Sequence, residues 1–138
     1  MVEPLIDEKN LILQTVFEVN KLEIVTDLNL FRQVVMNLFS NAIKFTEKGS
    51  ITVKLHRNEK SYILTVVDTG IGIGKEKQVA LFSEFYQAHN ESHNIKHSTG
   101  LGLALSQKVA KLIKGEIEIE SKGKQQGVKA SFRFISLE

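Results

Sequence analysis

Between residues 28 and 45 the sequence contains no Gly or Pro, and its apolar residues recur at helical spacing. Asp27, just before this stretch, is a residue type that caps helix N-termini well. The tripeptide Glu47-Lys48-Gly49, just after it, has the composition of a stop and turn. These features predict one long amphipathic helix, against which the other elements must pack.

The other patterned segments are β-like runs and shorter helical runs. Strands are predicted over residues 12–19, 22–25, 50–57, 62–67, 116–121 and 128–135. Helices are predicted over residues 75–86 and 101–114, separated by a polar loop over residues 87–99. The order predicts an α/β (α+β) fold, a two-layer sandwich. A mixed, mostly antiparallel sheet of about five strands would be covered on one face by three helices.

Composition excludes several classes of function. The chain has no cysteine, which removes disulfides, thiolate zinc sites and thiol catalysis and fits a reducing compartment. Its formal net charge is +2, so we expect neither a nucleic-acid partner nor direct membrane contact. With 42% hydrophobic and 25% charged residues, the chain has the composition of one globular domain.

Three polar residues lie on one side of the long predicted helix. Asn37, Asn41 and Lys44 follow one another at one-turn spacing beside the apolar face. An amide oxygen is a suitable Mg²⁺ ligand, and a lysine one turn further on could meet phosphate. An ordinary solvated helix face is the alternative.

A carboxylate and a glycine cluster follow the strand predicted over residues 62–67. Asp68 shares a face with Leu64 and Val66, where a carboxylate is costly unless a donor meets it. Gly70, Gly72 and Gly74 could let the backbone approach a ligand closely. Neither G-x-G-x-x-G nor the P-loop pattern fits this spacing, and a glycine-rich turn is the alternative.

A second glycine pair opens the helix predicted over residues 101–114. In Thr99-Gly100-Leu101-Gly102, either Thr99 or the preceding Ser98 could cap the helix, and the free N–H groups could bind an anion. A simple capped helix is the alternative. Two weaker signals precede it. The aromatic run at 81–86 could anchor a lid or belong to the core. The histidines at 89, 93 and 97 have a spacing that would suit a metal only if they lay on a helix.

Together, these motifs resemble the histidine kinases of the GHKL superfamily, which also contains gyrase, Hsp90 and MutL ATPase domains. Residues 37–46 resemble the N box, residues 68–73 the first glycine box, residues 82–85 the F box and residues 99–103 the second glycine box, in the family's order. The resemblance runs from about residue 10 to the C-terminus and implies the Bergerat α/β sandwich.

The resemblance implies ATP and Mg²⁺ as ligands and gives each motif a role. It makes Asn41 the Mg²⁺ ligand, with Asn37 its partner and Lys44 on the phosphate side. On the adenine side it implies contacts from Phe45, Asp68, Gly70, Gly72 and Ile73. It makes Thr99, Gly100, Leu101 and Gly102 the phosphate-cradling turn, with residues 87–98 as the ATP lid.

Asn37 stands where gyrase-type ATPases carry a water-activating glutamate, and an amide cannot act as a general base. The resemblance therefore implies phosphoryl transfer, with Asn37, Asn41 and Lys44 as catalytic residues, to a histidine on a separate dimerisation domain of the same kinase. A response regulator would be the indirect partner. Alternatives are a stand-alone GHKL ATPase or serine kinase, and a degenerate nucleotide-binding interaction module.

The sequence also suggests how this domain sits in a longer protein. No histidine has the flanking residues of a phosphoacceptor, so residues 1–10 are interpreted as a linker from a missing dimerisation domain, and 11–138 as the ATP-binding domain. We expect this fragment to be monomeric and cytoplasmic, with a parent that could be membrane-anchored. His97-Ser98 replaces glycines usual in the family, and Lys114-Gly115 a glycine pair.

Overall fold

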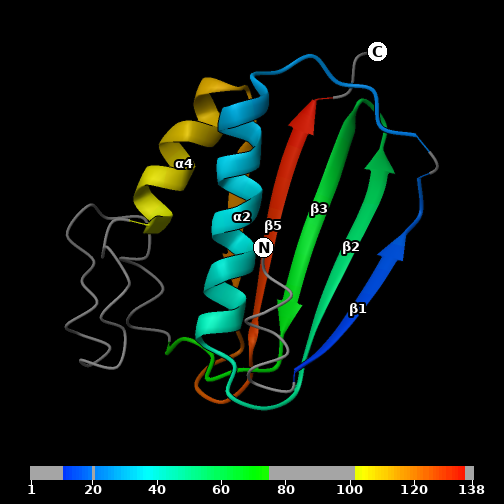
Figure 1. Cartoon of the computed structure of the whole chain (residues 1–138). Helices are drawn as coiled ribbons and strands as arrows, with labels where there is room; N and C mark the ends of the chain where they lie inside the picture. The colour runs from blue at the N-terminus through cyan, green and yellow to red at the C-terminus, as the bar shows by residue number, and fades with distance from the viewer. Residues whose placement is uncertain (1–10, 20, 75–101, 136–138) are drawn as a thin grey trace.

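A computed structural model describes residues 11–19, 21–74 and 102–135. Its elements along the chain are β1 (Ile12–Phe17), α2 (Leu28–Lys44), β2 (Ser50–Asn58), β3 (Ser61–Asp68), α4 (Gly102–Leu112), β4 (Glu116–Glu120) and β5 (Val128–Ile135). The strands form one five-stranded sheet in the order β1-β2-β3-β5-β4 (Figure 1). Strand β1 runs parallel to β2, and the other neighbours are antiparallel.

Helix α2 begins and ends close to the predicted residues. Asp27 caps it, because its Oδ1 accepts a hydrogen bond from the N–H of Leu30 at 3.1 Å. At the other end, the N–H of Phe45 still bonds to the carbonyl of Asn41, at 3.1 Å, just beyond the last helical residue, Lys44. The uninterrupted helical periodicity therefore gave the correct element with an error of one residue.

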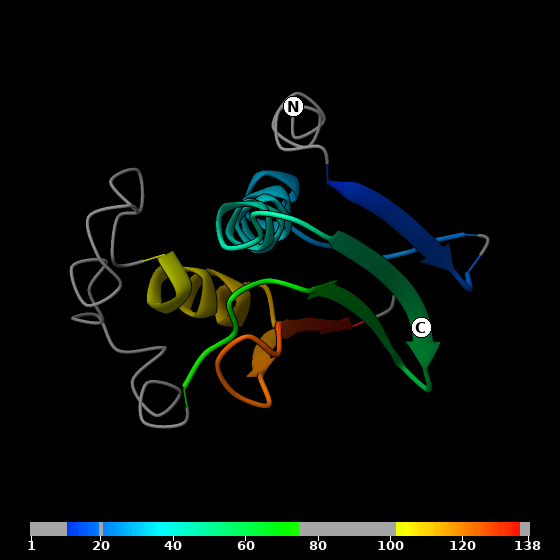
Figure 2. The same ribbon diagram turned by 90° about the horizontal axis from the view of Figure 1, so that it is seen from below.

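The predicted two-layer arrangement is confirmed. Figure 2 shows α2 and α4 on the same side of the sheet. The third predicted helix, over residues 75–86, and the loop over 87–99 lie outside the described residues. Neither described helix is both long and apolar enough to cross a bilayer.

One predicted strand is wrong. Residues 22–25 form no strand: they lie in the connection between β1 and α2 and pair with none of the five strands, so β propensity alone did not make them part of the sheet. The segment is fixed by other contacts: the N–H of Glu23 donates to the hydroxyl of Tyr62 at 3.3 Å. Tyr62 is itself buried in β3, so this bond ties the connection between β1 and α2 to the core.

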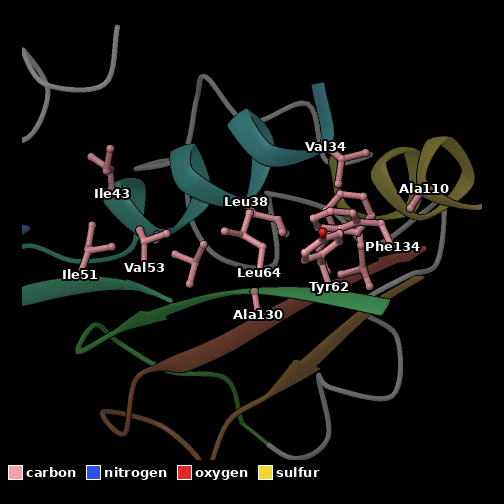
Figure 3. Close-up of a cluster of buried hydrophobic side chains, with 14 of the residues drawn as sticks. Val34, Leu38, Ile43, Ile51, Val53, Tyr62, Leu64, Ala110, Ala130 and Phe134 are labelled. Carbon is pink, nitrogen blue, oxygen red and sulfur yellow. The ribbon is translucent and has the colours of Figure 1, made fainter. Parts of the chain in front are cut away.

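The core lies between the helices and one face of the sheet. Val34, Leu38 and Ile43 of α2 point toward the side chains of the strands (Figure 3). An aromatic cluster fills one end: the rings of Phe31 and Phe134 meet edge to face with centroids 5.0 Å apart, and Phe134 stacks on Tyr62 at 5.6 Å. These contacts fix α2 over the sheet.

Candidate nucleotide-binding site

An apolar cavity lies between the C-terminal half of α2 and the sheet. Its space is about 630 Å³, including the part open to solvent. Its lining comes from α2, β3, the loop after β3, α4, β4 and β5: Leu38, Asn41, Ala42, Phe45, Val66, Asp68, Ile71, Gly72, Ile73, Leu103, Ile119, Val128 and Ala130. Such a cavity, apolar with few polar groups, is typical of small-molecule sites.

Asp68 is the buried carboxylate in this lining, with 7% of its surface exposed. Its Oδ1 accepts hydrogen bonds from the N–H groups of Gly70, at 2.9 Å, and Val128, at 3.1 Å. Within the described part of the chain, its Oδ2 receives no hydrogen bond. Burial raises the pKa of this carboxyl, and the two hydrogen bonds oppose that rise. One carboxylate oxygen is therefore positioned rigidly while the other can accept from a ligand.

Strand periodicity explains why Asp68 points inward. Tyr62, Leu64 and Val66 alternate along β3 and are buried on the helix-covered face, and Asp68 continues that alternation. The prediction that Asp68 shares this face is confirmed.

Helix α2 supplies the opposite wall. Leu38, Ala42, Phe45 and Asn41 all line the cavity; Phe45 is the C-cap residue, and Asn41 is the one amide-bearing residue of this wall. Asn41 and Ala42 lie one turn from Leu38, and Phe45 lies two turns from it, so all four are on one side of the helix.

The loop after β3 needs glycine at two positions. A Cβ on Gly70 would lie 2.1 Å from the carbonyl oxygen of Phe45, and one on Gly72 would lie 2.1 Å from that of Gly123. Gly72 also has a φ of 70°. These contacts press the loop against the end of α2 on one side and against the turn between β4 and β5 on the other.

That turn, over residues 121–127, supports the site and was missed by sequence reasoning. The N–H of Ile73 donates to Ser121 Oγ at 3.0 Å, and the N–H of Gly127 donates to the carbonyl of Gly70 at 3.2 Å. Gly127 has a φ of 73°, and a Cβ there would meet the carbonyl of Asp68 at 2.2 Å. Gly127 was the only hint of this turn that sequence reasoning noted, but a glycine before a strand does not show which loop it will contact.

Asn37 and Lys44 do not line this cavity. The amide nitrogen of Asn37 donates to Ser106 Oγ of α4, and Ser106 is buried, so this bond joins the two helices. Lys44 is half-buried in the last turn of α2, and burial lowers the pKa of its amine. The predicted roles, Asn37 as partner of the Mg²⁺ ligand and Lys44 on the phosphate side, therefore stay predictions.

The structure thus brings five of the predicted residues to one cavity: Asn41, Phe45, Asp68, Gly72 and Ile73. Gly102 begins α4, and the next residue, Leu103, reaches the cavity wall. Thr99, Gly100 and Leu101 lie outside the described residues, as do the aromatic run at 81–86 and the histidines at 89, 93 and 97. Among the described residues, no group of three or more His, Cys, Asp or Glu could hold a metal.

Comparison with known proteins identifies this arrangement. Residues 26–138 match the family described as histidine kinase-, DNA gyrase B- and HSP90-like ATPase. The chain belongs to this family. Within the ATPase family it is a catalytic domain of the sensor histidine kinase type, as the sequence motifs predicted.

Named relatives agree with this assignment. An aerobic respiration control sensor protein ArcB homolog of Haemophilus influenzae is 42% identical over 110 residues, covering 77% of this chain and 33% of that protein. The circadian input-output histidine kinase CikA of Synechococcus elongatus is 43% identical over 91 residues, covering 65% and 12%. The chain therefore spans a third or less of the length of these two proteins.

Solved structures agree on the fold. The catalytic domain of histidine kinase ThkA superposes with a TM-score of 0.83 at 26% identity, covering 98% of this chain and 86% of that one. The predicted Bergerat sandwich is therefore confirmed.

Proposed function

We propose that this domain binds Mg-ATP in the cavity and transfers the γ-phosphoryl group to a histidine of a separate dimerisation domain in the same kinase. One observation carries the proposal: Asp68, whose second oxygen accepts no hydrogen bond from the described residues, and the amide-bearing residue Asn41 line the same apolar cavity. The exocyclic amine of adenine is a donor that such a carboxylate would accept, and apolar walls suit the faces of the base.

The described residues fit a bound magnesium ion in one respect. Asn41 presents a neutral amide to the cavity, and Mg²⁺ bound with a nucleotide takes one or two protein oxygens while phosphates and waters complete its shell. When bound, the ion would neutralise charge on the phosphates. Asn41 would hold it, and Lys44 would meet phosphate charge from the next turn.

The other predicted residues would position the nucleotide. Asp68 and the backbone of Gly72 and Ile73 would hold adenine, and Gly70 would orient Asp68 by donating its N–H. Phe45 would close the adenine side of the cavity. At the start of α4, Thr99, Gly100, Leu101 and Gly102 would meet the phosphates, where a helix N-terminus favours anions.

Phosphoryl transfer is favoured over rapid ATP hydrolysis by the residue at position 37. An imidazole nitrogen of the partner domain would attack the γ-phosphorus, and ADP would leave. Hydrolysis needs a base for water, and Asn37, an amide that donates to Ser106, cannot take a proton. A stand-alone ATPase would need another base, which makes it the second candidate. The proposal also includes a response regulator downstream and action in the cytoplasm.

Calorimetric titration with ATP and Mg²⁺ tests the binding step. We expect micromolar affinity, roughly −8 kcal/mol at 1 μM. Asp68→Asn should weaken binding, whereas Glu118→Gln, an exposed change on β4, should not. No heat from the unaltered chain at millimolar ATP would disprove the proposal.

Transfer is tested by adding the histidine-bearing dimerisation domain of the parent kinase and following phosphate on protein. Labelled partner domain with little free phosphate supports the kinase. Steady phosphate release without the partner domain would favour the ATPase, and binding without either reaction would favour the interaction module.

A further inference from the structure

Strand β1 is an exposed edge with no charged residue. Its six residues, Ile12 to Phe17, are all exposed, including Ile12 and Phe17 at 60% each and Val16 at 41%. Among the described residues it pairs with β2 alone, and Figure 1 shows it as the outermost strand, away from both helices. An uncharged apolar edge of this kind offers backbone groups for pairing with another strand.

The outward-facing backbone groups can be identified from the pairing with β2. The N–H of Ile12 donates to the carbonyl of Gly49, and the N–H of Glu18 donates to that of Leu55, so the even-numbered residues face β2. Because backbone direction alternates along a strand, Leu13, Thr15 and Phe17 point their N–H and carbonyl groups away from the sheet.

These three residues are complementary to themselves. If a second copy pairs antiparallel with Thr15 opposite Thr15, Leu13 lies opposite Phe17 and Phe17 opposite Leu13. Every outward-facing backbone group of the three then finds a partner. Their side chains share one face of the sheet, giving two apolar pairs around a central Thr–Thr pair, which are favourable cross-strand combinations. A two-fold axis perpendicular to the sheet generates this arrangement.

The opposite edge of the sheet is protected. Strand β4 carries Glu116, Glu118 and Glu120 in alternation. The first and last form ion pairs with β5: Arg133 Nη2 lies 2.9 Å from Glu116 Oε1, and Lys129 Nζ lies 3.8 Å from Glu120 Oε1. Two such acidic edges would bring carboxylates close together. The acidic residues therefore disfavour pairing between two β4 edges, whereas β1 has no charged residue that would do so.

We propose that two copies of this chain associate through antiparallel β1–β1 pairing centred on Thr15, which joins their sheets into one continuous sheet. The second copy is the favoured occupant because the exposed strand is complementary to itself in backbone register and polarity and has no charge to repel a copy of itself. The proposal departs from the expectation of a monomer. It leaves the cavity open, because β2 separates β1 from the strand that carries Asp68.

A single strand pair buries less surface than a standard protein interface, so we expect dissociation on the order of tens of micromolar. Sedimentation equilibrium from micromolar to millimolar concentration should show the mass approaching twice the 15.5 kDa of the chain. Thr15→Lys and Thr15→Glu each place like charges opposite one another and should weaken the dimer about tenfold. Val25→Lys, at a site 82% exposed outside β1, is the matched control and should dimerise normally.

Mixing the two charged variants is the decisive measurement. Lysine on one copy would face glutamate on the other, so the mixture should dimerise about tenfold more tightly than either variant alone. A monomer at millimolar concentration, an unaltered dimer for Thr15→Lys, or no recovery on mixing would each overturn the proposal. ATP affinity should be equal in all these variants, so failure of the dimer leaves the proposed nucleotide site standing.

Discussion

Asp68 and Val128 are 60 residues apart in the chain, yet the N–H of Val128 donates to Asp68 Oδ1 at 3.1 Å. The bond arises because β5 pairs directly with β3, with Asp68 opposite Val128. With the N–H of Gly70 on the same oxygen, it fixes the carboxylate plane and leaves Oδ2 for a ligand. The sheet topology therefore orients the residue on which nucleotide binding is proposed to depend.

Asp68→Asn should weaken ATP binding about 10- to 100-fold, because a charge-assisted hydrogen bond to the ligand is replaced by a mismatched amide. The amide oxygen can still accept from Gly70 and Val128, so the fold should persist. Calorimetry measures the affinity, and circular dichroism checks the fold. Unchanged affinity would remove Asp68 from the site.

The same substitution should change how stability depends on pH. The pKa of Asp68 is raised by burial above the ordinary value of 3.8, so the folded chain binds this proton more tightly than the unfolded chain. The contribution to stability is then fully present below the unfolded-state pKa and is lost as pH rises through the folded-state pKa. Asp68→Asn avoids that loss, so without nucleotide its melting temperature should exceed that of the unaltered chain at neutral pH and converge with it in acid. A constant difference across this pH range would contradict the argument.

Gly72→Ala should destabilise the domain more than Gly123→Ala. Both positions have positive φ, 70° and 136°, but a Cβ at 72 meets the carbonyl of Gly123 at 2.1 Å, whereas one at 123 has no atom within 4 Å. Backbone strain alone costs about 1–2 kcal/mol, and the clash at 72 adds to it. Urea unfolding of both variants measures the difference, and equal losses would show that the loop relaxes freely.

Local pattern was enough to predict much of this site. Asp68 and Asn41 continue the periodicity of elements that bury one face, so their direction follows from period 2 in β3 and period 3.6 in α2. The capping role of Asp27 could likewise be predicted from its residue type and its position just before the helical pattern.

Contacts between segments far apart in the chain could not be predicted from local pattern in this way. Nothing in residues 128–135 shows that β5 pairs with β3 as well as with β4, and so the Val128 bond and the turn over 121–127 were missed. Residues 22–25 have the β propensity of a strand, but propensity yields a strand only where the segment pairs with a neighbour, and the complete sheet leaves these residues in the connection to α2.

Asn37 and Ser106 should be coupled in stability. Each alanine variant loses the same interhelical hydrogen bond, so each should cost about 1 kcal/mol, and the double variant should cost less than the sum. If Asn37 also serves the reaction, only Asn37→Ala should slow phosphoryl transfer. If the losses in free energy of unfolding are additive, the hydrogen bond contributes nothing to stability. If Ser106→Ala slows phosphoryl transfer as much as Asn37→Ala does, Asn37 acts only by positioning α4.

Thr26→Val should stabilise the domain. Thr26 Oγ1 is buried and has no hydrogen-bond partner among the described residues, beside the apolar side chains of Ile24 and Phe31. A buried hydroxyl without a partner costs about 1–3 kcal/mol, and valine keeps the shape of the side chain while removing that group. Thr69→Val is the matched control and should have the opposite sign, since Thr69 Oγ1 accepts from the N–H of Ser50 at 3.0 Å. Thermal unfolding of both variants gives the comparison: a lower melting temperature for Thr26→Val would show that its hydroxyl contributes to the fold through water or a partner beyond these contacts.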